Sequence, residues 1–379
     1  MSVQSEHQKP RVPAVSVPRR LLFSLLPVTC LCVSAEVVAR LWLPDSDTAS
    51  RLQQMRQVCI YLGNRPGNDL FAADSDCFWK LKKNVVLPKS HGPKWGGRMS
   101  NGLGFRNPEM QLAKPQATQR IVCYGDSTTF GFGVAMQEAW PALLEIGLQQ
   151  STANAYQVVN AGVPGYSSFQ GHRYLKRSLP RLTPDLIIAT FGNNDAWRWD
   201  DRSDRAHATR LQQLFTGWNW RQSQALAALS QIAQADSAPT AATDAAWARR
   251  VSQNFFQPVT EWRPRVNLQE FAENLQQMVG ICRAQKIPLV LLVWPDYFQV
   301  QGRLTIRNRY QHVIRQTALQ HQGVHCIDLL PVFRGLYPTS LGFYLDRDII
   351  HINAAGNRVV ANTLEQLLPR FLPLAGRAR

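Results

Sequence analysis

Four short polar motifs carry the residue types from which a hydrolytic site could be built. Ser127 follows Gly125 and Asp126 directly after an apolar run, and Asp348 and His351 stand three residues apart near the end of the chain. A serine hydroxyl becomes a nucleophile when an imidazole takes its proton, and a carboxylate beside that imidazole fixes its tautomer. We therefore expect Ser127 to be the nucleophile, His351 its base and Asp348 the partner of that base.

The other two motifs could supply hydrogen-bond donors to an oxyanion. The turn Asn-Ala-Gly-Val-Pro-Gly ends at Gly165, whose backbone N–H is one candidate donor. The run Gly-Asn-Asn-Asp at 192–195 adds an asparagine side chain as another. Each motif alone fits an ordinary turn or helix cap equally well. Their conjunction supplies a nucleophile, a base, its orienting carboxylate and oxyanion donors, which is the full set that acyl transfer requires.

Alternating strands and helices should bring these motifs together. Apolar runs predict buried strands at 120–125, 156–160, 185–191, 288–294 and 324–328. Amphipathic segments predict helices at 138–149, after the Asn267–Glu270 capping box, and at 354–368. Buried strands separated by helices favour the α/β class, with a parallel sheet covered on both faces. Ligands bind at the carboxyl ends of such strands, where three of the motifs fall.

The composition describes a folded chain with basic character. Hydrophobic residues make up 45% and charged residues 18% of the 379, which allows a sizeable core and excludes wholesale disorder. The formal net charge of +16 favours anionic neighbours, such as a membrane surface or an acidic glycan. No RNA-binding motif accompanies the charge, so nucleic acid is not an expected partner. The seven cysteines lack zinc-site spacing, and we expect no metal and no cofactor.

The N-terminus has the pattern of a targeting segment. A basic flank precedes the apolar run 21–35, which is typical of a signal peptide or a signal anchor. Cleavage could occur near Ala35, whereas a retained span must extend to about Leu43. Either outcome places the remaining chain outside the cytoplasm, and a soluble protein with an apolar first helix is the alternative. In an exported chain Cys59 and Cys77 could pair.

We divide the chain into three parts: residues 1–43 as tail and anchor, 44–118 as an extension packed on the core, and 119–372 as the hydrolase domain. The segment 197–265 interrupts the alternation of strands and helices, and it holds six of the eleven tryptophans. Both a cap over the catalytic edge and an ordinary surface insertion fit this composition.

Together the motifs resemble those of the SGNH, or GDSL-type, hydrolase superfamily, in its exported or membrane-anchored bacterial form. The matching blocks are GDST at 125–128, the Gly165 turn, GNND at 192–195 and DIIH at 348–351, and the resemblance covers about residues 118–370. It implies a three-layer α/β/α sandwich with a five-stranded parallel sheet. It also implies an oxyanion hole formed by Gly165, Asn194 and the backbone N–H of Ser127. A second acid, Asp346, has the wrong phase to replace Asp348.

The resemblance implies a serine esterase that cleaves short-chain, for example acetyl, esters through an acyl-enzyme. The substrate would be an acyl ester of a glycan or a lipid. Three alternatives stay open: an O-acetyltransferase acting on a glycan, a lipase or lysophospholipase, and a non-catalytic binding module tethered to the membrane.

Overall fold

The computed structural model describes residues 30–35, 37–38, 70–88, 97–152, 154–198, 202–209 and 263–372. The predictions for the basic tail, for Cys59 and for a cap formed by most of segment 197–265 lie outside these residues. The chain divides into two compact units, Met1–Asp47 with Thr216–Ala238, and Thr48–Phe215 with Pro239–Arg379. Of the first unit only a few helical residues are described, at 30–35 and 37–38. Within the described ranges, no helix has both the length and the apolarity needed to cross a membrane.

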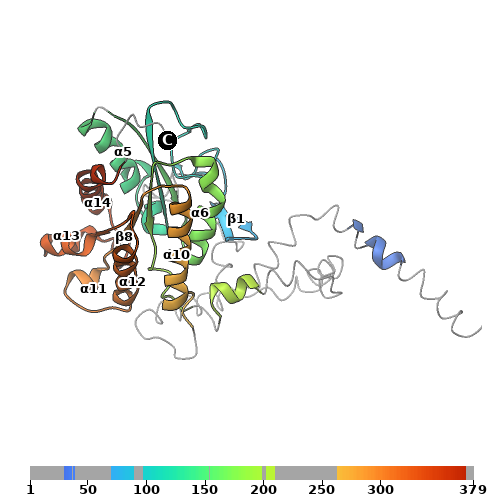
Figure 1. Ribbon diagram of the computed structural model, residues 1–379. Helices are drawn as coiled ribbons and strands as arrows, with labels where there is room; N and C mark the ends of the chain where they lie inside the picture. The colour runs from blue at the N-terminus through green and yellow to red at the C-terminus, as the bar shows by residue number, and fades with distance from the viewer. Residues whose placement is uncertain are drawn as a thin grey trace, which may run out of the picture. The chain divides into compact units, whose positions relative to one another are not determined.

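The second unit is built on a parallel sheet of five strands in the order β6-β5-β7-β8-β9 (Figure 1). The strands are β5 (Thr118–Gly125), β6 (Ala155–Gly162), β7 (Leu186–Thr190), β8 (Leu289–Val293) and β9 (Val324–Asp328). All five predicted strands are confirmed. Their apolar runs are continuous because helices cover both faces of the sheet.

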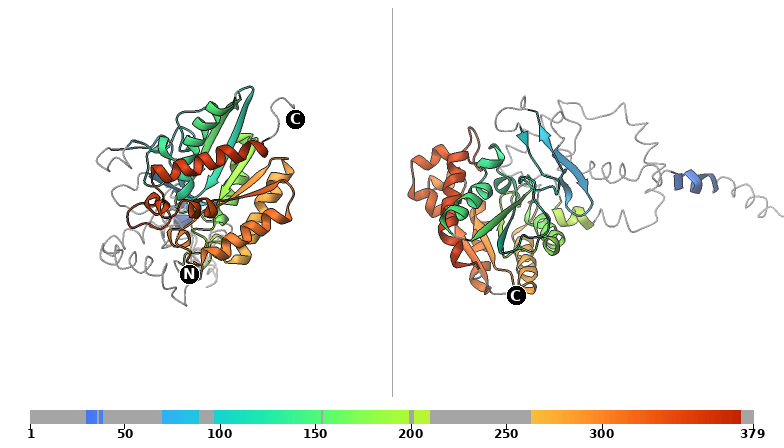
Figure 2. Two further views of the ribbon diagram at one scale, coloured as in Figure 1. Left: turned by 90° about the vertical axis from the view of Figure 1, so that its left-hand side faces the viewer. Right: turned by 90° about the horizontal axis from the view of Figure 1, so that it is seen from above.

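Helices form a layer on each face of this sheet (Figures 1 and 2). One layer contains α6 (Ser168–Leu182), α10 (Leu268–Ala284) and α12 (Arg307–Gln320), and the other contains α5 (Trp140–Ser151), α13 (Leu329–Gly335) and α14 (Ala354–Leu367). The α/β fold class and the three-layer sandwich are therefore confirmed. Shorter helical segments are α4 (Ser127–Phe130), α11 (Tyr297–Val300), η3 (Met136–Glu138), η6 (Thr339–Phe343) and η7 (Leu368–Arg370).

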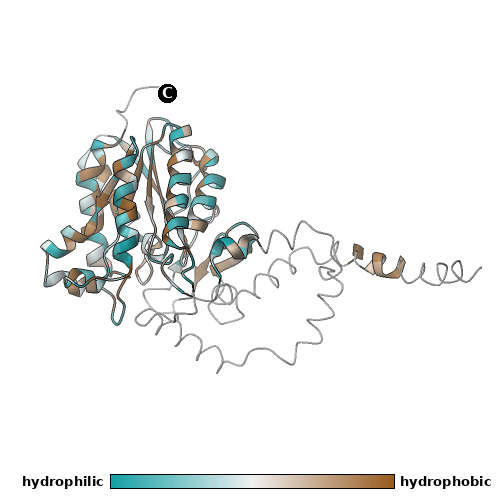
Figure 3. Cartoon of the chain, turned by 60° about the horizontal axis from the view of Figure 1, so that its bottom comes forward, coloured by the Kyte–Doolittle hydropathy of each residue, from teal (hydrophilic) through white to brown (hydrophobic). Residues whose placement is uncertain are grey.

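The alternating side chains of the strands separate the interior into two cores. Val122 and Tyr124 of β5 pack with the α6, α10 and α12 layer, whereas Ile121 and Cys123 pack with α5 and α14. All four are fully buried, and a large apolar side chain contributes about 1.5–3 kcal/mol when it is buried. Figure 3 shows the largely hydrophobic strands between helices whose outer sides are hydrophilic. The carboxyl ends of the strands thus emerge from a rigid base.

Two small antiparallel sheets precede the core, β1 (Phe71–Asp74) with β2 (Phe78–Leu81), and β3 (Val86–Leu87) with β4 (Gly97–Arg98). The β1–β2 hairpin contacts α6, because Arg177 donates to both oxygens of Asp74 at 2.9 and 3.0 Å. Cys77 lies in this hairpin as a buried free thiol, and Cys59, the partner that the sequence allowed for it, lies outside the described residues.

Candidate active site

Ser127 lies at the first position of α4, directly beyond the carboxyl end of β5. Gly125 precedes it for a steric reason rather than for a left-handed turn. A Cβ atom there would lie 2.1 Å from Thr129 Oγ1 and 2.9 Å from the Thr190 carbonyl oxygen. Glycine therefore lets the strand end approach α4 and β7 closely.

Asp126 connects the nucleophile to the third motif, a role that sequence analysis missed. Its Oδ1 caps α4 by accepting hydrogen bonds from the backbone N and the hydroxyl of Thr128, at 2.8 and 2.7 Å. Its Oδ2 accepts from the side-chain amides of Asn193 and Asn194, each at 3.2 Å. Burial raises the pKa of Asp126, and the bonds from Thr128 oppose that shift. The sequence signal for this capping role was an aspartate placed directly before Ser127, the first residue of a helix.

Ser127, His351 and Asp348 form an unbroken chain of hydrogen bonds. The Nε2 atom of His351 lies 2.7 Å from Ser127 Oγ, and its Nδ1 lies 2.6 Å from Asp348 Oδ2. A carboxylate accepts at Nδ1, so the proton resides on Nδ1 and Nε2 is left to accept from the serine. The ring of Phe132 packs against the imidazole, with 4.5 Å between ring centroids. The structure thus brings the Asp348–His351 pair to Ser127, although Ser127 and His351 stand 224 residues apart in the sequence.

The loop that carries Asp348 is itself fixed by hydrogen bonds. Asp348 Oδ1 accepts from the backbone N–H groups of Ile350 and His351, at 2.8 and 2.9 Å. Trp294, at the end of β8, donates its indole N–H to the Ile350 carbonyl at 2.9 Å. Burial acts to raise the pKa of Asp348, but the bonds from His351 outweigh it and the pKa is lowered. Asp346 is 96% exposed, with its carboxylate 3.9 Å from Arg347, so it is not part of this chain.

The expected oxyanion donors meet at the same edge of the sheet. Ser127 presents the N–H of the first helical residue, which has no acceptor within its own helix. Gly165 has a φ of 81°, a left-handed conformation that glycine adopts without strain. The side-chain nitrogen of Asn194 donates to the Tyr166 carbonyl at 3.0 Å and to Asp126 at 3.2 Å. Both of its hydrogens are engaged, so donation to an oxyanion requires sharing one of them.

Two further buried charged groups surround the site and were not found from the sequence. Arg307 lies 3.4 Å from Asp296 Oδ2, and Asp126 and Asp348 also act on it electrostatically. Burial lowers the pKa of Arg307 to about 10, so it remains a cation at neutral pH. Asp195 accepts from the N–H groups of Ser168 and Gly192, at 2.9 and 3.0 Å, and burial raises its pKa to about 6. The contacts of Asp195 link the end of β7 to the start of α6, which follows the Gly165 turn.

Replacing Asn194 with alanine should lower kcat on an ester substrate by about 10² to 10³, the usual cost of removing one oxyanion donor. KM should change little, because the donor acts on charge that develops during reaction. Steady-state kinetics with p-nitrophenyl acetate measures both constants. A loss of kcat smaller than threefold would exclude Asn194 from the oxyanion hole.

Part of the chain is similar to known proteins. Over 86 residues the chain is 30% identical to an arylesterase of Vibrio mimicus, which covers 23% of this chain and 42% of that protein. Over 82 residues it is 34% identical to thioesterase 1/protease 1/lysophospholipase L1 of Escherichia coli. This match covers 22% of this chain and 38% of that protein. The chain therefore matches less than half the length of these relatives. The structure of a lipase/acylhydrolase from Enterococcus faecalis aligns at 18% identity and a TM-score of 0.43, covering 69% of this chain and all of that one.

The chain also matches a family as a whole. The model of the GDSL-like lipase/acylhydrolase family covers residues 123–359, which is more than half of the chain and includes Ser127, Gly165, Asn194 and His351. With a parallel five-stranded sandwich and all four motifs at one edge of it, the chain belongs to the GDSL-like lipase/acylhydrolase family.

Proposed function

We propose that the protein is a serine esterase that hydrolyses acyl esters through an acyl-enzyme on Ser127. The observation that carries the proposal is the chain of contacts from Asp348 through His351 to Ser127, at 2.6 and 2.7 Å. This arrangement pairs a hydroxyl with an imidazole whose orientation a carboxylate fixes, which is how serine hydrolases activate their nucleophile. The family membership agrees with this chemistry.

The reaction proceeds in two halves. His351 Nε2 takes the hydroxyl proton as Ser127 Oγ attacks the ester carbonyl carbon, and the carbonyl oxygen becomes an oxyanion bound by the N–H groups of Ser127 and Gly165 and by Asn194. Collapse of this intermediate breaks the ester bond, and the leaving alcohol takes the proton from His351. His351 then deprotonates a water that attacks the acyl-serine carbonyl. The second intermediate collapses with cleavage of the bond to Ser127 Oγ, which takes the proton back from His351, and the carboxylic acid is released. Asp348 remains ionised throughout and stabilises the imidazolium.

We propose short-chain acyl esters, acetyl above all, as the substrate class. Relatives that bear the names arylesterase and esterase TesA support ester hydrolysis. A p-nitrophenyl ester series from acetate to palmitate tests the proposal, and kcat/KM should be highest for chains of two to four carbons. A maximum at eight or more carbons would instead favour a lipase. Acetyl transfer to an oligosaccharide that exceeds hydrolysis would favour an O-acetyltransferase.

The activity should fall as the pH is lowered from 8 to 5, because a general base can accept the serine proton only in its unprotonated form. Asp348 does not titrate in this range, since its pKa is lowered from an already acidic value. The acidic limb of the pH profile, over which activity declines, should therefore fit the uptake of a single proton. The pH dependence of kcat/KM for p-nitrophenyl acetate measures it, and a flat profile would contradict the role of His351.

Loss of folding is not the expected cause of this limb. The pKa of Asp195 in the folded state is about 6, above the value of an exposed aspartate, so the folded protein binds an extra proton between about pH 4 and 6. The contribution of Asp195 to stability therefore falls as the pH rises through this window and grows on acidification. Circular dichroism at each pH checks that the chain stays folded while activity declines.

A further inference from the structure

Three successive carbonyl groups, two at the end of the second motif and one directly after it, accept hydrogen bonds from three distant segments. Trp79 of the β1–β2 hairpin donates its indole N–H to the Pro164 carbonyl at 3.0 Å. Arg265, at the end of the segment 197–265, donates to the Gly165 carbonyl at 2.7 Å. Asn194 donates to the Tyr166 carbonyl at 3.0 Å. The donors of the first two bonds lie 85 and 100 residues away in the chain.

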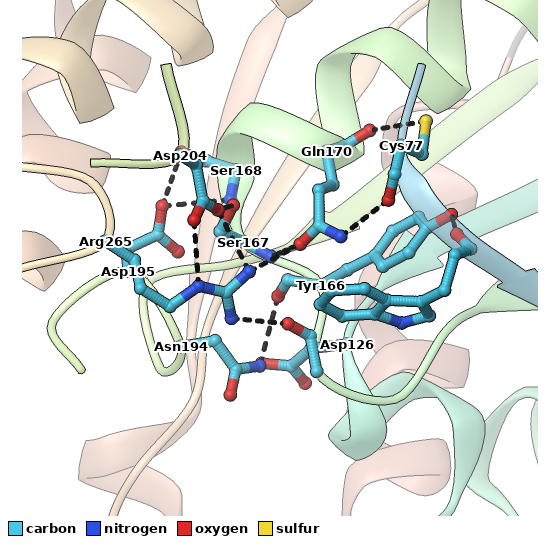
Figure 4. A network of polar contacts seen from close by, with 12 residues as sticks. Cys77, Asp126, Tyr166, Ser167, Ser168, Gln170, Asn194, Asp195, Asp204 and Arg265 are labelled. Carbon is cyan, nitrogen blue, oxygen red and sulfur yellow. Dashed lines mark hydrogen bonds and ion pairs between the residues drawn. The ribbon is translucent and has the colours of Figure 1, made fainter. Parts of the chain in front are cut away.

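Arg265 is fixed by a buried ion pair (Figure 4). Its Nε and Nη2 donate to the two carboxylate oxygens of Asp204, at 3.1 and 2.9 Å, and Nη2 also donates to Gln170 Oε1 at 2.6 Å. The side chains of Arg265 and Asp204 are 1% and 0% exposed. Asp204 also accepts from the Ser167 hydroxyl at 2.6 Å. The pair therefore connects both ends of the segment 197–265 to the turn that contains Gly165.

These hydrogen bonds fix the orientation of the two peptide groups on either side of Gly165. The Pro164 carbonyl and the Gly165 N–H belong to one planar peptide group, in which a trans bond points them in opposite directions. The bond from Trp79 to the carbonyl therefore sets where the Gly165 N–H points. Arg265 fixes the next peptide plane through the Gly165 carbonyl. Both planes need this restraint, because glycine is the residue with the greatest backbone freedom.

Stability alone does not account for such an ion pair. The cost of removing two charges from water is commonly as large as their mutual attraction, so an apolar pair of similar volume would fold as well. An apolar pair could not donate to the Gly165 carbonyl, however. The retained charge and its hydrogen bonds therefore fit a role in orienting this turn.

We propose that Trp79 and Arg265 are positioning residues that hold the Gly165 N–H in its oxyanion-binding direction. The inference rests on the proposed esterase function and extends the site beyond the motifs. Trp79 lies outside the part of the chain that matches the family, which begins at residue 123. The N-terminal extension and the segment 197–265 would each contribute one restraint to the oxyanion hole.

Trp79→Phe is the sharper test, because it keeps an aromatic ring and removes the indole N–H that reaches Pro164. We expect kcat for p-nitrophenyl acetate to fall about tenfold, part of the ~10² to 10³ that loss of a whole donor costs, with KM within about twofold. Activity is expressed per serine titrated with a fluorophosphonate. A merely structural defect would reduce the number of titratable serines and leave kcat per serine unchanged. Tyr124→Phe is the control, since it removes a buried hydroxyl that contacts Ser178 and not this turn.

The double variant Arg265→Met with Asp204→Asn tests the second restraint without leaving a buried charge unpaired. It should also lower kcat per titrated serine about tenfold, and the acid limb of the pH profile should not move, because His351 and Asp348 are untouched. Arg265→Lys, which keeps a cation beside Asp204, should recover part of the activity.

If the wild type is active and either variant keeps kcat per titrated serine within twofold of wild type, the inference is wrong while the proposed function stands. A wild type that neither labels nor turns over esters would remove the proposed function, and this inference with it.

Discussion

Replacing Ser127 with alanine is expected to lower kcat on p-nitrophenyl acetate by about 10⁴ to 10⁶, the range seen when a serine hydrolase loses its nucleophile. Without Oγ no acyl-enzyme can form, and the remaining donors at Gly165 and Asn194 can only assist attack by water. The imidazole of His351, whose Nε2 lies 2.7 Å from Ser127 Oγ, would be left without its partner. Steady-state kinetics at saturating substrate measures the loss.

Ser151→Ala provides the matched control for this experiment. Ser151 lies exposed at the last residue of α5, where its hydroxyl donates to the Gly147 carbonyl. The same deletion of one oxygen should there leave kcat within twofold of wild type. If Ser127→Ala kept more than a hundredth of wild-type kcat, Ser127 would not be the nucleophile.

Asp348→Asn is expected to lower kcat by about 10⁴, nearly as much as loss of the nucleophile, because it selects the wrong tautomer of His351. An amide nitrogen facing Nδ1 donates to it, so the ring proton moves to Nε2 and the nitrogen beside Ser127 can no longer accept. The loop should keep its shape. The Asn oxygen can still accept from the N–H groups of Ile350 and His351, as Asp348 Oδ1 does.

Asp346→Asn is the control for the charge itself. It removes a carboxylate two residues away in the same loop, but that side chain is 96% exposed and faces Arg347. We expect kcat within twofold of wild type. Comparable losses for Asp346→Asn and Asp348→Asn would mean that the charge of the loop matters, and not the contact between Asp348 and His351.

The sheet and the contacts among Ser127, His351 and Asp348 were predictable because the strand and motif signals are local. A parallel strand covered on both faces is a continuous apolar run, as in Ile121 to Tyr124, and the residue after it must lie at the ligand edge. Helices α6 and α12 gave weaker signals. Their inner faces include polar residues such as Gln170 and Gln311, which are buried because main-chain carbonyls of other segments accept from them. The spacing of hydrophobic residues in the sequence does not reveal such hydrogen-bond partners.

The restraints on the turn that contains Gly165 could not be predicted from the sequence. Trp79 and Arg265 reach this turn through hydrogen bonds to the carbonyls of Pro164 and Gly165, and only the folded chain brings these residues together. The motif likewise does not reveal that the side-chain amide of Asn194 donates two hydrogen bonds. Their acceptors, Asp126 and the Tyr166 carbonyl, come from other segments of the chain. Motifs identify the reacting groups, whereas the restraints on them arise from contacts of long sequence separation.

The most direct test is covalent labelling of the full chain with a fluorophosphonate, followed by intact-mass measurement and peptide mapping. An activated serine attacks the phosphorus and displaces fluoride, so the wild type should gain one phosphonyl group on Ser127, and Ser127→Ala should gain none. A wild-type chain that stays unmodified, or that carries the group on a residue other than Ser127, would contradict the account.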